Sequence, residues 1–75
     1  MFKVTIINPR EILYLGLGEE VVLPTEEGEL TLLEFHQPLL TRLHKGTIKV
    51  DKRWFFSIKD GIAHMRRDEL VAIVE

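Results

Sequence analysis

The sequence contains no cysteine, and this absence removes two common ways of stabilising a chain of 75 residues. A disulfide framework is excluded, and no cysteine and histidine cluster suggests a structural zinc site. No apolar run reaches the roughly 20 residues of a membrane-spanning helix, and the first residues do not form the apolar segment of a signal peptide. We therefore expect one domain, residues 1–75, that is soluble when isolated and has a thin core.

An excess of positive charge is also missing. The chain has 10 lysine and arginine residues against 12 aspartate and glutamate residues, which gives a net charge of −2 at pH 7. This balance argues against broad electrostatic capture of nucleic acid. The first 34 residues carry seven acidic and two basic side chains, whereas residues 35–75 carry five acidic and eight basic ones. Either these charges are solvated everywhere, or an acidic edge and a basic edge meet different partners.

Proline and glycine are few, with three and five residues, and they fall between apolar runs that alternate with the two-residue period of β-strands. A short helix at residues 39–44 is an alternative to a strand there. The expected strands lie at residues 2–7, 11–17, 21–23, 30–34, 39–43, 47–50, 54–59, 61–66 and 69–75. Short strands at near-regular spacing predict an all-β fold, either a small sandwich of two packed, mainly antiparallel sheets or a barrel, with about eight to ten strands.

The segments between these strands contain residues that are typical of turns. Pro38 lacks a backbone N–H, so we expect a corner between two strands there. Gly46 is expected to adopt a positive φ in a tight turn. Asp60 followed by Gly61 is the strongest hairpin signal, because both residues tolerate a type I′ turn. It predicts that the strand beginning at Trp54 pairs directly with the strand that follows it.

The alternation also predicts which side chains are buried. Trp54, Phe56 and Ile58 share one face of their strand, which places Trp54 in the core. The expected core residues are Val4, Ile6, Leu32, Leu40, Ile48, Val50, Trp54, Phe56, Ile58 and Ile73. On this interpretation, Trp54→Ala lowers the free energy of unfolding by roughly 3–5 kcal/mol.

No residue pattern indicates catalysis or metal binding. His36, His44 and His64 are eight and twenty residues apart, which matches no helical or hairpin pair of metal ligands. No nucleophile lies in a recognisable elbow. His64 is expected to point outward from its strand, and we expect no cofactor.

The aromatic run at residues 54–56 leaves a second interpretation open. Together with Lys49, Lys52 and Arg53 it could form a stacking platform for single-stranded nucleic acid, on a free-standing small β-barrel binding module. Core packing is favoured, because the alternation leaves only Phe55 on the outer face.

The central part of the chain resembles a known family. Its motif consists of Gly28 and Glu29, six further residues, and then His36, Pro38, Leu39, Leu40 and Thr41. The other matching pieces are Asn8-Pro9-Arg10-Glu11, Gly16, Val21-Val22-Leu23-Pro24 and Asp60-Gly61-Ile62-Ala63. In this order and spacing they resemble the β-sandwich domain of the epsilon subunit of F-type ATP synthases, called delta in mitochondria. The resemblance covers nearly the whole chain and departs from the usual family pattern at residues 31–35.

The resemblance implies a function without chemistry of its own. In that family the sandwich is a non-catalytic part of the rotor stalk, which docks on the gamma subunit and touches the c-ring, so that proton or sodium flow is coupled to ATP synthesis. It implies no enzymatic activity, no nucleic-acid partner, and membrane contact only through the complex. The implied location is the cytoplasmic face of a bacterial inner membrane. Typical members continue into a helical hairpin, which we do not expect in this chain.

The resemblance also implies partner-binding residues. Glu29 lies in an acidic turn, flanked by Glu27 and Gly28, and is expected at the end that faces the c-ring. The residues expected near gamma are His36, Pro38, Leu39, Leu40 and Thr41. Glu29 and His36 are expected to act in assembly and not in folding, because each lies in a turn or corner.

Overall fold

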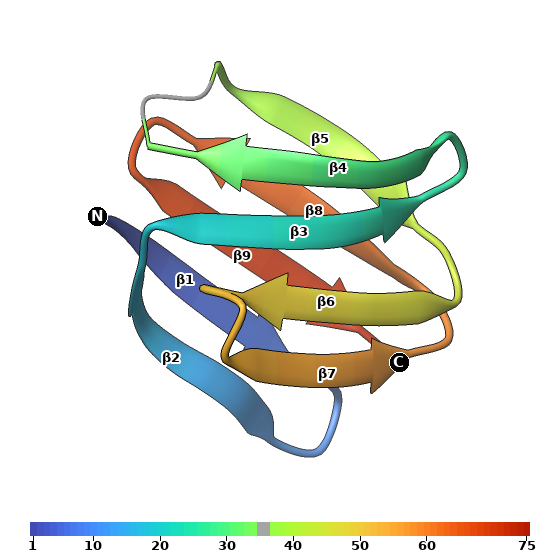
Figure 1. Ribbon diagram of the computed structural model, residues 1–75. Helices are drawn as coiled ribbons and strands as arrows, with labels where there is room; N and C mark the ends of the chain where they lie inside the picture. The colour runs from blue at the N-terminus through green and yellow to red at the C-terminus, as the bar shows by residue number, and fades with distance from the viewer. Residues whose placement is uncertain (35–36) are drawn as a thin grey trace.

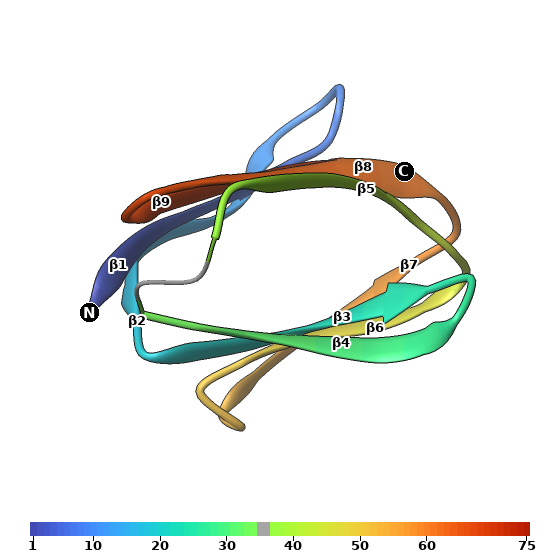
Figure 2. The ribbon, with the colours of Figure 1, turned by 90° about the horizontal axis from the view of Figure 1, so that it is seen from above.

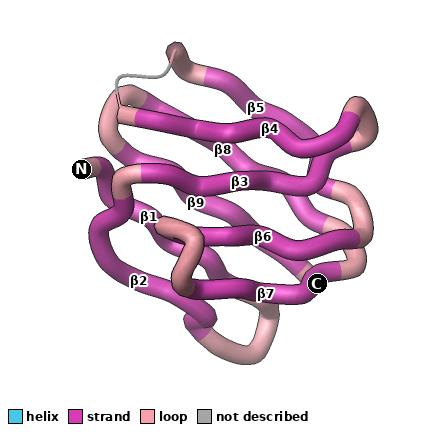
Figure 3. Tube along the Cα trace, in the orientation of Figure 1, coloured by secondary structure: helices cyan, strands magenta, loops and turns pink. Residues whose placement is uncertain are grey.

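The computed structural model describes residues 1–34 and 37–75, and the regular structure within these residues is entirely β (Figures 1 and 3). The strands are β1 (Phe2–Ile7), β2 (Ile12–Gly18), β3 (Glu20–Thr25), β4 (Gly28–Leu33), β5 (Leu39–Leu43), β6 (Gly46–Val50), β7 (Trp54–Ile58), β8 (Gly61–Arg66) and β9 (Glu69–Val74). Exposed and buried side chains alternate along strands such as β8, as they do in a strand with one face on a core. The all-β prediction is confirmed, and the segment for which a short helix was an alternative is β5.

The strands form two layers that pack face to face (Figure 2). The β1 layer has the order β2-β1-β9-β8-β5, and the β3 layer has the order β4-β3-β6-β7. The paired strands are antiparallel except for β1 and β9, which are parallel. A residue pair between Thr25 of β3 and Leu43 of β5 joins the two layers along one side. The fold is therefore the predicted sandwich, and this junction brings it close to a barrel.

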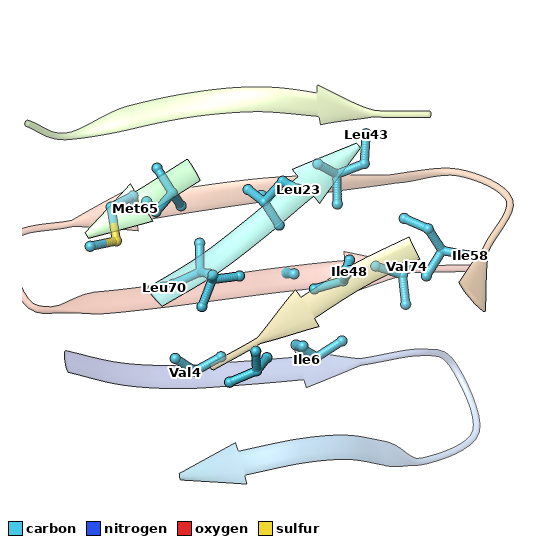
Figure 4. Packing of buried hydrophobic residues seen from close by; sticks show 14 of the residues in the cluster. Val4, Ile6, Leu23, Leu43, Ile48, Ile58, Met65, Leu70 and Val74 are labelled. Carbon is cyan, nitrogen blue, oxygen red and sulfur yellow. The ribbon is translucent and has the colours of Figure 1, made fainter. Parts of the chain in front are cut away.

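The core lies between the layers and is built from side chains that point inward. The buried apolar residues are Phe2, Val4, Ile6, Val21, Leu23, Leu32, Leu43, Ile48, Val50, Ile58, Ala63, Met65, Leu70, Ala72 and Val74. Figure 4 shows side chains from both layers, such as Ile48 and Val74, directed into the same space. The core prediction is confirmed for Val4, Ile6, Leu32, Ile48, Val50 and Ile58.

Three predicted core residues are exposed, so these predictions are wrong: Leu40 is 70% exposed, Ile73 is 55% exposed and Trp54 is 48% exposed. The reason in β9 is the phase of the alternation. Its inward positions include Ala72 and Val74, which leaves Ile73 on the outer face. Leu40 likewise lies on the outward-facing positions of β5.

Trp54 lies at the rim of the sandwich because β7 is an edge strand. Its ring centroid is 6.5 Å from that of Tyr14 on β2, and the Arg53 guanidinium lies 5.6 Å from the same ring. Phe56 is only partly buried and meets Tyr14 edge-on at 6.1 Å. These aromatic side chains therefore lie at the rim of the sandwich between β2 and β7 instead of filling its centre.

Asp60 and Gly61 do not form the predicted hairpin. Strand β7 pairs with β6, whereas β8 pairs with β5 and β9, so the chain crosses from one layer to the other at these two residues. Gly61 does not have a positive φ. Its lack of a side chain serves close packing, because a Cβ there would lie 2.7 Å from the carbonyl oxygen of Ile73.

Left-handed backbone occurs at other positions than predicted. Gly28 has a φ of 111° in the β3–β4 turn, and Asp51 and Lys52 have φ values of 54° and 55° between β6 and β7. Gly46 was expected to adopt a positive φ and does not. It instead allows a close approach, since a Cβ there would lie 2.7 Å from the Cβ of Pro24.

Candidate docking surface

Much of the outer face of the β1 layer is apolar, which is uncommon for a sheet surface directed to solvent. The pairing registers align its side chains in rows across the strands. One row contains Ile12, Ile7, Ile73, Ile62 and Arg42, and the next contains Leu15, Thr5, Val71, His64 and Leu40. Of the ten large apolar side chains that are exposed within the described residues, six lie here: Ile12, Leu15, Leu17, Leu40, Ile62 and Ile73. We call this surface the apolar face.

The outer face of the β3 layer has a different character. Its large, exposed apolar side chains are Leu33 and Phe55, and the half-buried Val22 and Pro24 of β3 lie between polar neighbours such as Thr31 and Glu29. The Lys49 ammonium on β6 lies 3.2 Å from the Glu29 carboxylate on β4, so this ion pair passes over β3. It joins a basic residue from the second half of the chain to an acidic residue from the first half. Most of the large exposed apolar side chains among the described residues thus lie on the outer face of the β1 layer.

A shallow groove of about 610 Å³ lies at one end of the apolar face. Ile62, Ile73 and Pro9 contribute to its lining. Figure 2 shows the β1–β2 turn, which contains Pro9, rising above the β1 layer. The Asn8 side-chain oxygen accepts hydrogen bonds of 2.8 Å from the backbone amides of residues 10 and 11, which holds this turn in shape. The groove therefore has a formed wall beside an apolar floor.

An ion pair lies at the same groove. The Arg42 guanidinium is 3.4 Å from one carboxylate oxygen of Asp60, and the Gly61 amide donates a 2.8 Å hydrogen bond to the other. The Gly61 amide and then the Arg42 side chain hold the pKa of the Asp60 carboxyl below its ordinary value. Because both side chains are at least half exposed, the pair contributes little to stability. Its charges can therefore be offered to a partner.

The predicted acidic turn forms the tip of the β3–β4 hairpin. The Thr25 hydroxyl donates to the carbonyl oxygen of Gly28 at 2.7 Å and accepts from the Glu27 amide at 3.3 Å. The φ of 111° at Gly28 is one that side-chain-bearing residues rarely adopt. The Glu29 side chain is 62% exposed. The turn is thus held by its own hydrogen bonds and presents its carboxylates to solvent, as the sequence predicted.

The second predicted set surrounds the start of β5. Pro38 is exposed, Leu39 packs partly buried against the core, and Leu40 lies on the apolar face opposite His64. Thr41 is half-buried. His36 lies outside the described residues. Within this set, Leu40 is the member that the apolar face includes.

The structure does not bring the two predicted sets together. The acidic turn is at the start of β4, and the second set follows the end of β4 (Figure 1). A strand of six residues spans about 17 Å between its ends. The two sets can therefore meet two different partners at once.

Most residues of the apolar face were not predicted from the sequence. Leu15 and Leu17 of β2, together with Ile62 and Ile73, were not predicted as surface residues. A signal for Leu15, Leu17 and Ile73 exists, because the runs at residues 12–17 and 70–74 are apolar on both faces of their strands. A strand with two apolar faces needs two covering surfaces, and the core supplies one of them.

Side chains that could bind a metal ion are not grouped in the part of the chain that the structure describes. No three histidine, aspartate or glutamate side chains among residues 1–34 and 37–75 are grouped so that they could hold a metal ion. His64 is exposed, as predicted. Within the same residues there is no helix of the length and apolar character needed to cross a membrane.

Comparison with known proteins gives this fold a family. The description of the ATP synthase delta/epsilon chain β-sandwich domain matches residues 1–75. The chain belongs to this family. The resemblance found in the sequence is confirmed, and the match extends over every strand of the delta/epsilon sandwich.

Named relatives agree with this assignment. The ATP synthase epsilon chain 2 of Ralstonia nicotianae is 35% identical over 79 residues, which cover 100% of this chain and 57% of that protein. The ATP synthase epsilon chain of Rippkaea orientalis is 39% identical over 75 residues, which cover 96% of this chain and 55% of that protein. The chain thus spans little more than half the length of these relatives.

A solved structure shows the same delta/epsilon fold at lower sequence similarity. A chain of the Tetrahymena thermophila mitochondrial ATP synthase central stalk and c-ring superposes with a TM-score of 0.82 at 19% identity. The superposition covers 96% of this chain and 61% of that chain. The two-layer arrangement is therefore shared with a chain of that assembly despite extensive sequence divergence.

Proposed function

We propose that this domain belongs to a non-catalytic subunit of the rotor stalk of an F-type ATP synthase. There it docks on the gamma subunit and the c-ring and helps to couple ion flow to ATP synthesis. Family membership supports this role, as do relatives named ATP synthase epsilon chain. The observation that carries the proposal is the apolar face, because a domain of this kind acts through its surface. The domain would be peripheral to the membrane, at the cytoplasmic face in a bacterium.

The apolar face is the surface we assign to gamma. Leu40, Ile62 and Ile73 stand around the groove and are at least half exposed, so a partner that covers them removes a large apolar area from water. The Arg42 and Asp60 charges at the groove can orient that partner. Five hydrogen-bonded strands carry the face above a packed core. A load applied there passes to the whole domain without a hinge, which suits a coupling element.

The remaining predicted residues complete the assignment. Glu29, with Glu27 and Gly28 beside it, is assigned to contact with the polar loops of the c-ring. The residues assigned to the gamma contact beside the apolar face are His36, Pro38, Leu39 and Thr41. Since β4 separates the acidic turn from this second set, the domain can contact ring and stalk together.

Leu40→Glu is expected to weaken binding to the cognate gamma subunit by about 100-fold, because it buries a carboxylate at an apolar contact. The matched control is Leu33→Glu, which changes an exposed leucine on the outer face of the other layer and is expected to alter affinity less than threefold. Isothermal titration calorimetry with purified gamma measures both affinities. Equal losses for the two variants would show that the apolar face is not the docking surface. Failure of the unmodified protein to bind gamma would overturn the proposed function.

Glu29→Lys is expected to leave folding stability within about 0.5 kcal/mol, because the Lys49 pair that it removes is exposed. It is expected to reduce ATP-driven proton pumping by reconstituted synthase, since it reverses a charge assigned to the c-ring contact. Glu19→Lys changes another exposed glutamate, outside both predicted sets and outside the β1–β2 turn, and serves as the matched control. Unfolding of the Glu29→Lys protein would show that the acidic turn is structural. Unchanged pumping would remove Glu29 from the ring contact.

A further inference from the structure

Strand β7 (Trp54–Ile58) is an edge strand with one open side. It pairs with β6 along its length, and no other strand in the described part of the chain pairs with it. Its five residues include no proline, glycine or charged side chain. Proline and charged residues commonly protect an edge strand from further pairing, and β7 lacks this protection. The strand can therefore accept another strand through its backbone N–H and C=O groups.

Aromatic side chains stand on both sides of this open edge. Phe55 is 59% exposed on the outer face of the β3 layer, and Trp54 is 48% exposed at the rim. Tyr14 supports the Trp54 ring from the neighbouring layer at 6.5 Å. The Tyr14 hydroxyl is itself fixed, since it donates a 3.0 Å hydrogen bond to the carbonyl oxygen of Leu17. Aromatic groups that are already held in place lose little conformational freedom when a partner covers them.

Basic side chains flank both ends of β7. Lys52 and Arg53 precede the strand and Lys59 follows it, and all three are exposed. Arg53 and Lys59 are six positions apart, a span of about 20 Å in an extended chain. Asp51, in the same turn, accepts hydrogen bonds of 2.8 and 2.9 Å from two backbone amides at the start of β3. Its carboxylate is thereby directed at those amides.

This charge pattern selects among possible partners. A second copy that paired antiparallel with the edge would set Arg53 against Lys59, and a parallel copy would set Arg53 against Arg53. Like charges at opposed positions destabilise strand pairing. A segment with an acidic residue at each end avoids this repulsion in either direction. The charges therefore disfavour self-association and favour an acidic partner.

We propose that the open edge of β7 binds an extended, acidic-ended segment of a partner protein by strand addition. The segment has about seven residues, set by the separation of the flanking basic side chains. Its carboxylates meet Arg53 and Lys59, and its apolar middle residues cover Trp54 and Phe55. This site lies on the β3 layer, whereas the face assigned to gamma lies on the β1 layer. The two sites can therefore be inactivated separately.

Trp54 is the sole tryptophan of the chain, so its fluorescence reports directly on this edge. The probe is the capped peptide Glu-Val-Thr-Val-Thr-Val-Glu, titrated into the protein at low ionic strength. We expect a saturable shift of the Trp54 emission to shorter wavelength. A peptide with lysine at both ends is expected to bind at least about tenfold more weakly, because it faces like charges. Two adjacent prolines at its centre should abolish binding. One of any two adjacent residues in an added strand directs its N–H at the edge, and proline has no N–H.

Two protein variants separate this site from the one assigned to gamma. Phe55→Thr is expected to weaken binding of the acidic peptide at least about tenfold, since it removes apolar contact area beside the edge without adding a charge that would attract the acidic ends. Leu40→Glu is expected to leave peptide binding unchanged while it impairs binding to gamma. Loss of both activities in either variant would contradict two independent sites.

Other results would overturn the proposal. Equal affinity for the acidic and lysine-ended peptides, or no emission shift with any peptide, excludes an acidic strand at this edge. An emission shift with a twelve-residue oligodeoxythymidine that competes with the acidic peptide would assign the edge to single-stranded nucleic acid instead. Concentration-dependent dimerisation that Phe55→Thr abolishes would identify a second copy as the occupant.

Discussion

Phe2→Ala is expected to lower the free energy of unfolding by about 3–5 kcal/mol, a large part of the roughly 5–15 kcal/mol that keeps a domain folded. Phe2 is 1% exposed and belongs to β1, which lies between β2 and β9. Its removal leaves a cavity, and strands held on both sides cannot move easily to fill it. Urea unfolding followed by circular dichroism measures the loss as a lower midpoint at an unchanged slope.

Phe55→Ala is the matched control, because it makes the same deletion on a side chain that is 59% exposed. Its expected cost is below about 1 kcal/mol. Trp54→Ala is expected to cost about 1–2 kcal/mol, because roughly half of its surface is already in water. A loss at Phe55 as large as that at Phe2 would contradict the assignment of faces. So would a loss of 3 kcal/mol or more at Trp54, the value that the sequence alone predicted.

Gly61→Ala is expected to lower the free energy of unfolding by about 2–3 kcal/mol through overpacking. The new Cβ would lie 2.7 Å from the carbonyl oxygen of Ile73 and 3.1 Å from the Cα of Val74, and both atoms belong to the backbone of β9. A backbone hydrogen-bonded in the middle of the β1 layer cannot retreat as a flexible side chain would. Thermal and urea unfolding of the purified variant measure the loss.

Gly28 provides the control that separates steric crowding from backbone conformation. Its φ is 111° and nothing lies within 4 Å of an added Cβ, so the cost of Gly28→Ala arises from backbone strain alone. Chemical synthesis of the chain allows D-alanine at either position. D-alanine should be tolerated at Gly28, since D-residues favour positive φ, and should not rescue Gly61. If D-alanine at position 61 preserved the stability of the protein, Gly61 would have a positive φ, as the predicted hairpin at Asp60 and Gly61 requires.

Local alternation was sufficient to predict where most strands lie. The expected strands at residues 2–7 and 61–66 coincide with β1 and β8, because a two-residue period ended by glycine, proline or aspartate is a property of neighbouring residues. The acidic turn was predicted for the same reason, since Gly28 can adopt the φ that the turn needs.

Strand partners could not be predicted in this way. Asp60 and Gly61 have the composition of a tight hairpin, yet the chain uses them to cross between layers. The inward residues of β8, Ala63 and Met65, are fully buried when that strand lies between β5 and β9. The burial gained by a whole strand outweighs the preference of a two-residue turn.

The candidate site was predicted only in part. The family motif pointed to the acidic turn and to Leu40, which the structure leaves exposed. It did not point to Ile62 or Ile73, because neither belongs to the central motif. Their role as surface residues depends on the outer face of strands that neighbour β5 in space but lie far from it in the sequence.

The sequence by itself determined the β class, the family and the turn that presents Glu29, because each rests on short residue patterns and on their order along the chain. Only the tertiary structure decided which apolar residues form the core and which form the docking surface. In β9, Ala72 and Ile73 are both apolar, so the alternation does not distinguish the two sides of that strand. The side that becomes buried is the one on which the β3 layer packs, and that packing exists only once both layers have formed.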